Sequence, residues 1–260
     1  MAEVRVQRDD GIGRVVFSNP EKYNALNHEM WKAIPRALAE LADDPQVRVI
    51  VLEGEGEKAF VSGADISQFG SQRTEPGARD RFGEAVEDAY LAPVHCPKPV
   101  IAKIRGICMG GGLGLAAACD LRICSTDARF RMPAARLGLG YNATGVQRFM
   151  TVLGVQNTYD IFFSARIFGA EDALRMGFVL QAVAPEALDQ AVDDYARNLA
   201  GNAPLTLKAL KATVNALLPD PGTRDLRAAD AAIKACFDSA DYREGAKAFM
   251  EKRAPRFTGA

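Results

Sequence analysis

The sequence has few of the residues that build metal centres or histidine-based active sites. Only two histidines, His28 and His95, occur among the 260 residues, which excludes a histidine-rich metal site. His28 falls at an expected helix start and His95 in a proline-rich loop, positions typical of surface histidines. We therefore expect no metal and assign neither histidine a catalytic role.

Cysteine usage excludes two further classes of protein. The five cysteines are an odd number, and no two of them have C-x-x-C spacing. This pattern fits neither a disulfide framework nor a zinc knuckle. Reduced and mostly buried thiols are expected.

The chain has no excess of charge and no long apolar run. It carries 32 basic and 33 acidic side chains, a net charge of -1, so nucleic acid is not an expected partner. The longest apolar run, residues 113–119, is far shorter than the roughly 20 residues that span a bilayer. The N-terminus lacks a basic and apolar leader, so we expect a cytoplasmic protein with no membrane partner.

The composition that remains is that of an ordinary globular protein of one or two domains. Runs of β-branched residues bounded by turn residues predict strands near residues 4–6, 14–17, 47–52 and 100–104. Asn27 can cap a helix that extends to about Leu41, in which Pro35 predicts a kink or a late start. Strands and helices alternate in this half, which predicts the α/β class.

The periodicity becomes helical from about Gly145 onward. Helical segments are expected near residues 146–153, 156–163, 170–176, 187–200, 204–217 and 223–252. Pro204 stands at a first helical position after a break. We predict a core of residues 1–200 followed by a helical region of residues 201–260.

A glycine cluster, residues 110–112, follows a strand and opens an apolar helix. A G-x-G-x-x-A match begins at Gly112, but a second begins at Gly138, and no acidic residue lies about 20 positions beyond Gly112 to bind a ribose hydroxyl. No G-K-[ST] follows either, so a nucleotide P-loop is excluded. A helix N-terminus with accessible backbone amides remains, which suits an anion or a developing oxyanion.

Three ordered blocks carry a resemblance to a known family. Residues 59–66 read AFVSGADI, residues 19–27 read NPEKYNALN, and residues 106–120 contain the glycine cluster. Together they resemble the enoyl-CoA hydratase/isomerase, or crotonase, superfamily, and the resemblance covers essentially the whole chain. It implies a spiral of ββα units followed by C-terminal helices that trimerise, giving a homotrimer or a hexamer built as a dimer of trimers.

The resemblance also implies a set of site residues. The backbone amides of Ala64 and Gly111 match the family's oxyanion hole for the thioester carbonyl of an acyl-CoA substrate, whose coenzyme A is part of the substrate rather than a separate cofactor. One such donor is typically worth about 2.7–4 kcal/mol of transition-state stabilisation. The residues implied to bind substrate are Ala25, Lys58, Phe60, Ser62, Asp65, Ile66, Gly110, Pro133, Ala134 and Leu137, with Phe249 and Lys252 reaching a neighbouring subunit's nucleotide.

The sequence departs from the family pattern where hydratases carry two glutamates. Gly114 and Ala134 stand at those positions, and neither side chain can transfer a proton. A positioned acid or base typically contributes about 10²–10⁴-fold to the rate, so ordinary two-glutamate hydration is not expected. Asn142 stands where the family's dehalogenases carry a nucleophilic aspartate, which excludes that route.

Tyr141 is the catalytic candidate that remains. Residues 132–145 are similar to the methylmalonyl-CoA decarboxylase branch, whose active-site tyrosine matches Tyr141, although that branch has a histidine at Ala64 and a glutamate at Gly114. Decarboxylation generates the enolate without a base, so we expect decarboxylation of a malonyl-type CoA, with Tyr141 or water returning the proton.

Three alternatives stay open. Enoyl-CoA hydration or isomerisation would use unusual groups such as Tyr141 or Asp65, with Arg136 a further polar candidate. A catalytically silent protein would bind acyl-CoA without converting it. Nicotinamide oxidoreduction is the most remote alternative. The acyl pocket is expected to take its walls from loops such as residues 69–86, a polar segment that we expect to be mobile.

Overall fold

The computed structural model describes residues 2–65 and 78–260. A six-stranded sheet has the order β1-β2-β3-β5-β7-β10, and a four-stranded sheet has the order β4-β6-β8-β9. The first sheet contains β1 (Glu3–Asp9), β2 (Ile12–Ser18), β3 (Val49–Gly54), β5 (Val100–Ile104), β7 (Leu121–Ser125) and β10 (Gln181–Val183). The second contains β4 (Ala59–Val61), β6 (Ile107–Met109), β8 (Arg129–Arg131) and β9 (Ile167–Gly169). Pairing is parallel except for β1 with β2 and β8 with β9.

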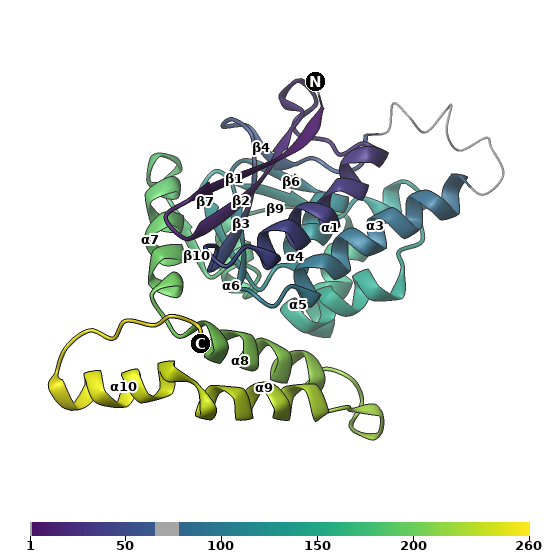
Figure 1. The fold of residues 1–260 in the computed structure, drawn as a ribbon. Coiled ribbons are helices and arrows are strands. Elements are labelled where there is room, and N and C mark those ends of the chain that lie inside the picture. The colour runs from purple at the N-terminus through teal and green to yellow at the C-terminus, as the bar shows by residue number, and fades with distance from the viewer. Residues whose placement is uncertain (1, 66–77) are drawn as a thin grey trace.

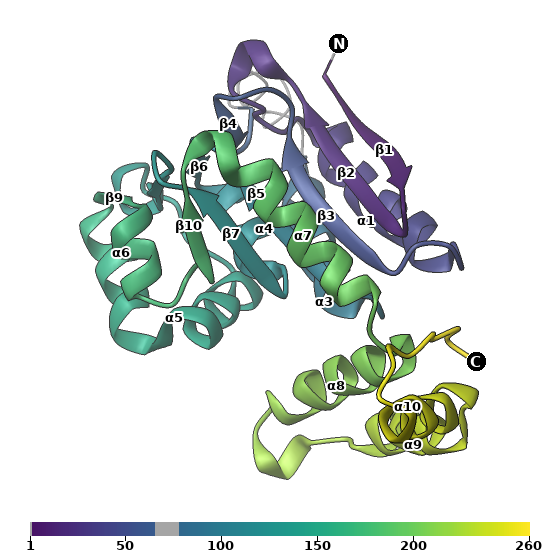
Figure 2. The same cartoon turned by 90° about the vertical axis from the view of Figure 1, so that its left-hand side faces the viewer.

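Helices cover both faces of the larger sheet and continue beyond it. They are α1 (His28–Asp43), α3 (Ala78–His95), α4 (Gly111–Ala118), α5 (Ala143–Ser164), α6 (Ala170–Arg175), α7 (Leu188–Ala200), α8 (Pro204–Leu217), α9 (Arg227–Asp238) and α10 (Ala240–Glu251). Figure 1 shows α1, α3 and α4 on one side of the sheet. Figure 2 shows α7 on the opposite side, and α8–α10 as a separate helical layer below the core. The α/β architecture agrees with the sequence prediction.

The central strands are mostly apolar because both of their faces are buried. Along β3, Ile50 and Leu52 join the main core with α1, α3 and α4, whereas Val49 and Val51 join a smaller core beneath α7. Alternate residues of one strand thus serve two hydrophobic cores.

Three local predictions need correction. The helix capped by Asn27 runs from His28 through Pro35 to Asp43, so it has no late start. Residues 78–86 of the expected loop are the first turns of α3, while residues 69–77 lie outside the described residues. The segment expected as one helix over 223–252 is two helices divided at Ser239, whose hydroxyl caps α10 by accepting from Tyr242 N at 3.0 Å.

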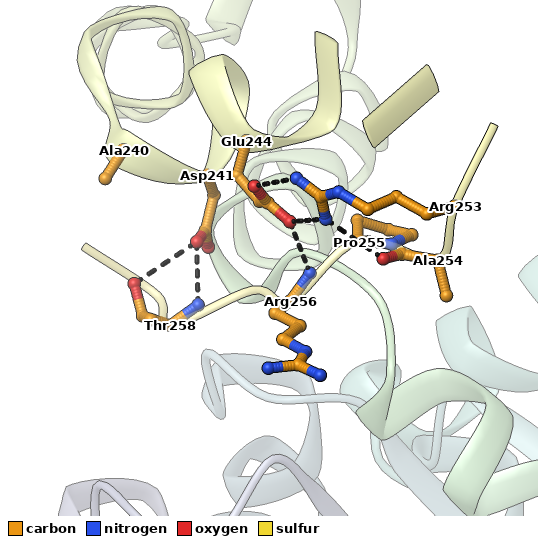
Figure 3. A pocket seen from close by; sticks show the side chains of 8 residues that line it. All are labelled: Ala240, Asp241, Glu244, Arg253, Ala254, Pro255, Arg256 and Thr258. Carbon is orange, nitrogen blue, oxygen red and sulfur yellow. Dashed lines mark hydrogen bonds and ion pairs between the residues drawn. The ribbon is translucent and has the colours of Figure 1, made fainter. Parts of the chain in front are cut away.

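The C-terminal tail folds back over α10 (Figure 3). The buried Asp241 carboxylate accepts from Thr258 N at 2.7 Å and from Gly259 N at 2.8 Å. Glu244 accepts from Arg256 N at 2.9 Å and pairs with Arg253. Arg48 donates to the carbonyl of Phe257 at 3.0 Å, which ties the tail to the core.

Two features are absent from the part of the chain that the structure describes. None of its helices is both long and apolar enough to cross a membrane. No three histidine, cysteine or acidic side chains gather there as a metal ion would require.

Candidate active site

The N-terminus of α4 packs directly on β4 because its glycines leave no side chain between them. A Cβ on Gly112 would overlap the carbonyl oxygen of Val61. Gly110, at the N-cap, has φ 53°, a left-handed conformation that favours glycine. Gly111 is the first residue of α4, and amides of a first helical turn have no intrahelical acceptor. The close packing therefore presents the Gly111 N–H, to which residues 2–65 and 78–260 offer no acceptor, beside the end of β4.

The chain that leaves β4 brings a second amide to the same place. Gly63 O accepts from Leu26 N, and Asp65 N donates to Leu26 O, both at 2.9 Å. Gly63 and Asp65, on either side of Ala64, therefore form the two hydrogen bonds of the Leu26–Ala64 bridge. The N–H of Ala64 itself points away from Leu26. A Cβ on Gly63 would lie 3.9 Å from Gly111 N. The chain that leaves β4 is therefore in contact with the N-terminus of α4.

A buried asparagine holds this loop in shape. Asn24 has φ 55° and is almost fully buried. Its side-chain amide donates to Glu55 O at 3.0 Å and to Ala59 O at 2.8 Å, and its Oδ1 accepts from Asn19 N at 3.0 Å. Lys22 pairs with the buried Asp65 at 2.8 Å. These contacts fix the segment that presents Ala64.

Two tyrosine hydroxyls occupy the space beside Gly114, one turn along α4. Tyr90 from α3 and Tyr141 from the loop before α5 approach to 2.9 Å between their hydroxyl oxygens. Tyr90 also donates to Gly111 O at 3.2 Å. A Cβ on Gly114 would overlap the Tyr90 hydroxyl and lie 2.6 Å from that of Tyr141. The hydroxyl pair therefore stands where a side chain at position 114 would point.

Burial keeps both phenols protonated. It raises the pKa of Tyr90 well above its ordinary value, and the neighbouring Tyr141 adds to the shift. Burial raises the pKa of Tyr141 to about 12, with the hydrogen bond to Tyr90 acting in the opposite direction. At neutral pH the pair is a source of hydrogen-bond donors, and neither member is a free base.

Comparison with known proteins places this arrangement in a family. A family model described as enoyl-CoA hydratase/isomerase matches residues 7–260. The chain belongs to the enoyl-CoA hydratase/isomerase family. The predicted class, an acyl-CoA enzyme of this family, is thereby confirmed.

Individual family members match this chain along its whole length. The short-chain-enoyl-CoA hydratase of Clostridium acetobutylicum is 32% identical over 250 residues, which are 96% of this chain and 95% of the relative. The carnitinyl-CoA dehydratase of Salmonella arizonae is 34% identical, with 98% of each chain covered. A solved structure of an enoyl-CoA hydratase/carnithine racemase from Magnetospirillum magneticum has a TM-score of 0.94 at 32% identity, covering 100% of this chain and 97% of the other. The predicted crotonase fold is confirmed.

In this member of the enoyl-CoA hydratase/isomerase family, several predicted site residues lie around the two amides. Ala25 is buried beside the Leu26–Ala64 bridge. Ser62 donates to Lys22 O at 3.0 Å, and Asp65 follows Ala64 directly. Pro133 lies 3.8 Å from where a Cβ on Gly110 would be. Ala134 is buried in a short 3-10 helix, which Leu137 follows as an exposed residue.

The other predicted residues are buried in the core, exposed to solvent or part of the C-terminal helical layer. Phe60 is buried in the main core, where its ring meets that of Phe17 edge-on. Lys58 and Arg136 are exposed to solvent. Ile66 lies outside the described residues. Phe249 and Lys252 belong to the separate layer of α8–α10, away from α3 and α4 (Figure 1).

Sequence reasoning missed Tyr90 and Asn24. Tyr90 stands 51 residues before Tyr141, on a helix that was not predicted, and no motif in the sequence joins the two. Asn24 lies within the block 19–27, but its inward side chain depends on a left-handed backbone that only the structure reveals.

Proposed function

We propose that this enzyme hydrates an enoyl-CoA, with a tyrosine hydroxyl in place of the usual glutamates. The observation that carries the proposal is the meeting of the Gly63–Ala64 and Gly110–Gly111 segments, one helical turn from the Tyr90–Tyr141 pair. The names of the hydratase and dehydratase relatives support this reaction over decarboxylation.

The two amides act on the thioester carbonyl. When the N–H groups of Ala64 and Gly111 donate to its oxygen, they polarise the conjugated double bond and stabilise the enolate that forms on addition. Preorganised donors of this kind need no reorganisation during the reaction. The side chains of Ala64 and Gly111 take no part in this step.

The neutral Tyr141 hydroxyl then moves protons in both directions. The water oxygen forms a bond to the β-carbon while one water proton passes to the Tyr141 oxygen. The Tyr141 proton passes to the α-carbon, and the π bond between the two carbons breaks. Tyr141 ends in its starting form, so the step requires neither a phenolate nor a carboxylate.

Decarboxylation of a malonyl-type CoA is the second candidate. It is favoured by the absence of a carboxylate at Gly114 and Ala134 together with a Tyr141 that stays protonated. In that reaction the bond to the departing carboxylate breaks to give carbon dioxide and the enolate, and Tyr141 or water protonates the α-carbon.

One experiment separates the two reactions. Purified enzyme is incubated with crotonyl-CoA and methylmalonyl-CoA, and the masses of the acyl-CoA species are followed. Gain of water by crotonyl-CoA supports hydration, and loss of carbon dioxide from methylmalonyl-CoA supports the second candidate. No change in either substrate would contradict both and favour a binding role.

Ala64 provides the matched pair of variants. Ala64→Pro removes the amide hydrogen, and we expect turnover to fall by about 10²–10³-fold. Ala64→Gly keeps the amide and should retain turnover. Position 111 is less suitable because a Cβ there would lie 2.9 Å from Trp31 Cζ2. Equal turnover in the two Ala64 variants would contradict the role of the amide.

We also propose that the enzyme works as a homotrimer, or a hexamer of two trimers, in the cytoplasm. The side chain of Phe249 is 83% exposed on a helical layer rich in apolar residues, which supports burial against a second copy. In that assembly Phe249 and Lys252 would reach a neighbour's coenzyme A. Light scattering after size-exclusion chromatography measures the assembly, and a monomer at micromolar concentration would contradict it.

A further inference from the structure

We propose that Tyr90 is a positioning residue that determines whether the Tyr141 hydroxyl presents its proton or its lone pair to the acyl group. This inference rests on the proposed function, since it concerns the same proton transfer. It adds to the site a residue on α3 that would not touch the substrate.

Tyr90 is held more rigidly than Tyr141. It is only 2% exposed, and its ring meets Trp31 edge-on with centroids 6.0 Å apart. Its hydroxyl has two partners, Gly111 O at 3.2 Å and the Tyr141 hydroxyl at 2.9 Å. The position of Tyr90 is therefore fixed at both its apolar and its polar end.

Tyr141 is fixed mainly through its ring. The Phe149 and Phe162 rings pack edge-on against it, with centroids 6.2 Å and 5.2 Å away. These contacts hold the ring plane but leave the hydroxyl hydrogen free to rotate. Among the described residues, Tyr90 is the polar partner that the Tyr141 hydroxyl contacts. The direction of the Tyr141 proton thus depends on Tyr90.

Counting protons gives two arrangements. A carbonyl oxygen such as Gly111 O can only accept, and each hydroxyl has one proton to donate. When Tyr90 donates to Gly111 O, Tyr141 donates to Tyr90 and turns a lone pair toward the acyl side. When Tyr90 donates to Tyr141 instead, the Tyr141 proton is free to point toward the α-carbon. Rotation of the Tyr90 hydroxyl exchanges the two.

The second arrangement meets both requirements of the proposed step at once. Tyr90 then occupies one lone pair of the Tyr141 oxygen, a further lone pair accepts the proton from water, and the Tyr141 proton is delivered to carbon. In the first arrangement Gly111 O accepts the Tyr90 proton, so the Tyr141 proton is turned toward Tyr90 and away from the acyl group. Because Gly111 N is also a proposed oxyanion donor, the same residue links the carbonyl site to the proton site.

The test is a double-mutant cycle on the wild-type reaction. Tyr90→Phe removes one hydroxyl and keeps the ring, and Tyr141→Phe does the same at the proposed donor. We expect Tyr90→Phe to lower kcat by about 10–100-fold, the scale of a small misplacement of a reacting group, with KM for the acyl-CoA within about twofold. In the Tyr141→Phe background, Tyr90→Phe should cause no further loss, because it acts through Tyr141. Tyr195→Phe, on α7, is the matched control and should leave kcat unchanged.

A structural role would give a different pattern. If Tyr90 only supports the fold of α4, its loss would lower kcat by the same factor in the wild-type and Tyr141→Phe backgrounds. Additive losses, or a rise in KM alone, would overturn the proposal.

A second readout does not require turnover. The chain has six tyrosines, so 3-fluorotyrosine labelling gives at most six ¹⁹F resonances, of which Tyr141→Phe identifies one. Tyr90→Phe should move that resonance, whereas Tyr195→Phe should not. If the wild type converts neither substrate, the proposed function fails, and this measurement alone decides whether Tyr90 positions Tyr141. An unmoved resonance would overturn the inference even in an active enzyme.

Discussion

Gly114 has no room for a side chain, because the hydroxyl oxygen of Tyr141 lies 2.6 Å from the position that its Cβ would take. The glutamate that the family resemblance implies at this position is therefore not simply missing. The volume it would need is already occupied by the hydroxyl pair, so the glycine and the tyrosines form one arrangement.

Substitution at Gly114 should therefore destabilise the fold. Overpacking a closed site typically costs about 1–3 kcal/mol, and we expect Gly114→Ala to lower the free energy of unfolding by this amount in urea denaturation. Gly114→Glu should cost more and should not create an ordinary hydratase. Gly83→Ala is the control, since that glycine also lies in a helix and nothing approaches its Cβ position within 4 Å. Equal stability of the Gly114→Ala and wild-type enzymes would contradict the packing argument.

Local patterns were sufficient for the α/β class, whereas the crotonase fold and the two amides as candidates came from the resemblance to the enoyl-CoA hydratase/isomerase family. Apolar runs mark the buried strands, and glycines mark the close approach of α4 to β4. The short strands β4, β6, β9 and β10 have three residues each, too few to show a period. Their positions come from pairing across the sheet, which a sequence pattern does not contain.

The pairing of the Tyr90 and Tyr141 hydroxyls could not be predicted from the sequence for a related reason. Tyr141 could be singled out by its place in a motif, but Tyr90 becomes relevant only because α3 packs beside α4. Phe60 is a different case, because it belongs to a motif and yet its ring fills the core. Motif membership places a backbone near the site, whereas packing decides where each side chain points.

Alkaline pH should reveal that the Tyr141 hydroxyl is shielded from solvent. Its pKa in the folded protein is raised to about 12, above the ordinary value near 10 that applies when the chain is unfolded. The unfolded chain therefore loses this proton first, and the associated stability is full below pH 10 and is lost as the pH rises toward 12. Urea denaturation at several pH values should show a shallower decline in Tyr141→Phe than in the wild type. Tyr159→Phe, an exposed tyrosine, should decline as the wild type does, and identical slopes in all three would contradict the prediction.

An ion network fastens α7 to the sheet. Glu53 on β3 is 8% exposed and pairs with Lys103 and, at 3.6 Å, with Arg14 Nη1. Lys103 pairs with Asp189 at 2.8 Å, and Arg14 with Asp193 at 2.5 Å, both on α7. The two cations therefore bridge the buried glutamate and the helix.

Removing the Glu53 charge should be costly. Breaking a buried pair by removing one partner typically costs about 3–5 kcal/mol, and we expect Glu53→Gln to fall at the lower end because the α7 aspartates still contact both cations. The measurement is the free energy of unfolding in urea. Glu40→Gln, which breaks an exposed pair with Arg8, should cost less than about 1 kcal/mol. A similar small loss at Glu53 would mean that the network adds little to stability.

The C-terminal tail should be released by a single substitution in the layer shown in Figure 3. Asp241→Ala removes the acceptors of Thr258 N and Gly259 N, and unsatisfied groups of this kind typically cost about 1–3 kcal/mol each when they stay buried. The tail can avoid that cost by leaving the surface of α10, so we expect faster removal of its residues by carboxypeptidase, followed by mass spectrometry. Asp225→Ala, which breaks an exposed pair with Arg227, should leave the digestion rate unchanged. Because Arg48 still donates to the carbonyl of Phe257, digestion should slow at that residue. Digestion that continues without a pause into α10 would contradict this, and it would show that Asp241 supports the whole layer of α8–α10 rather than the tail alone.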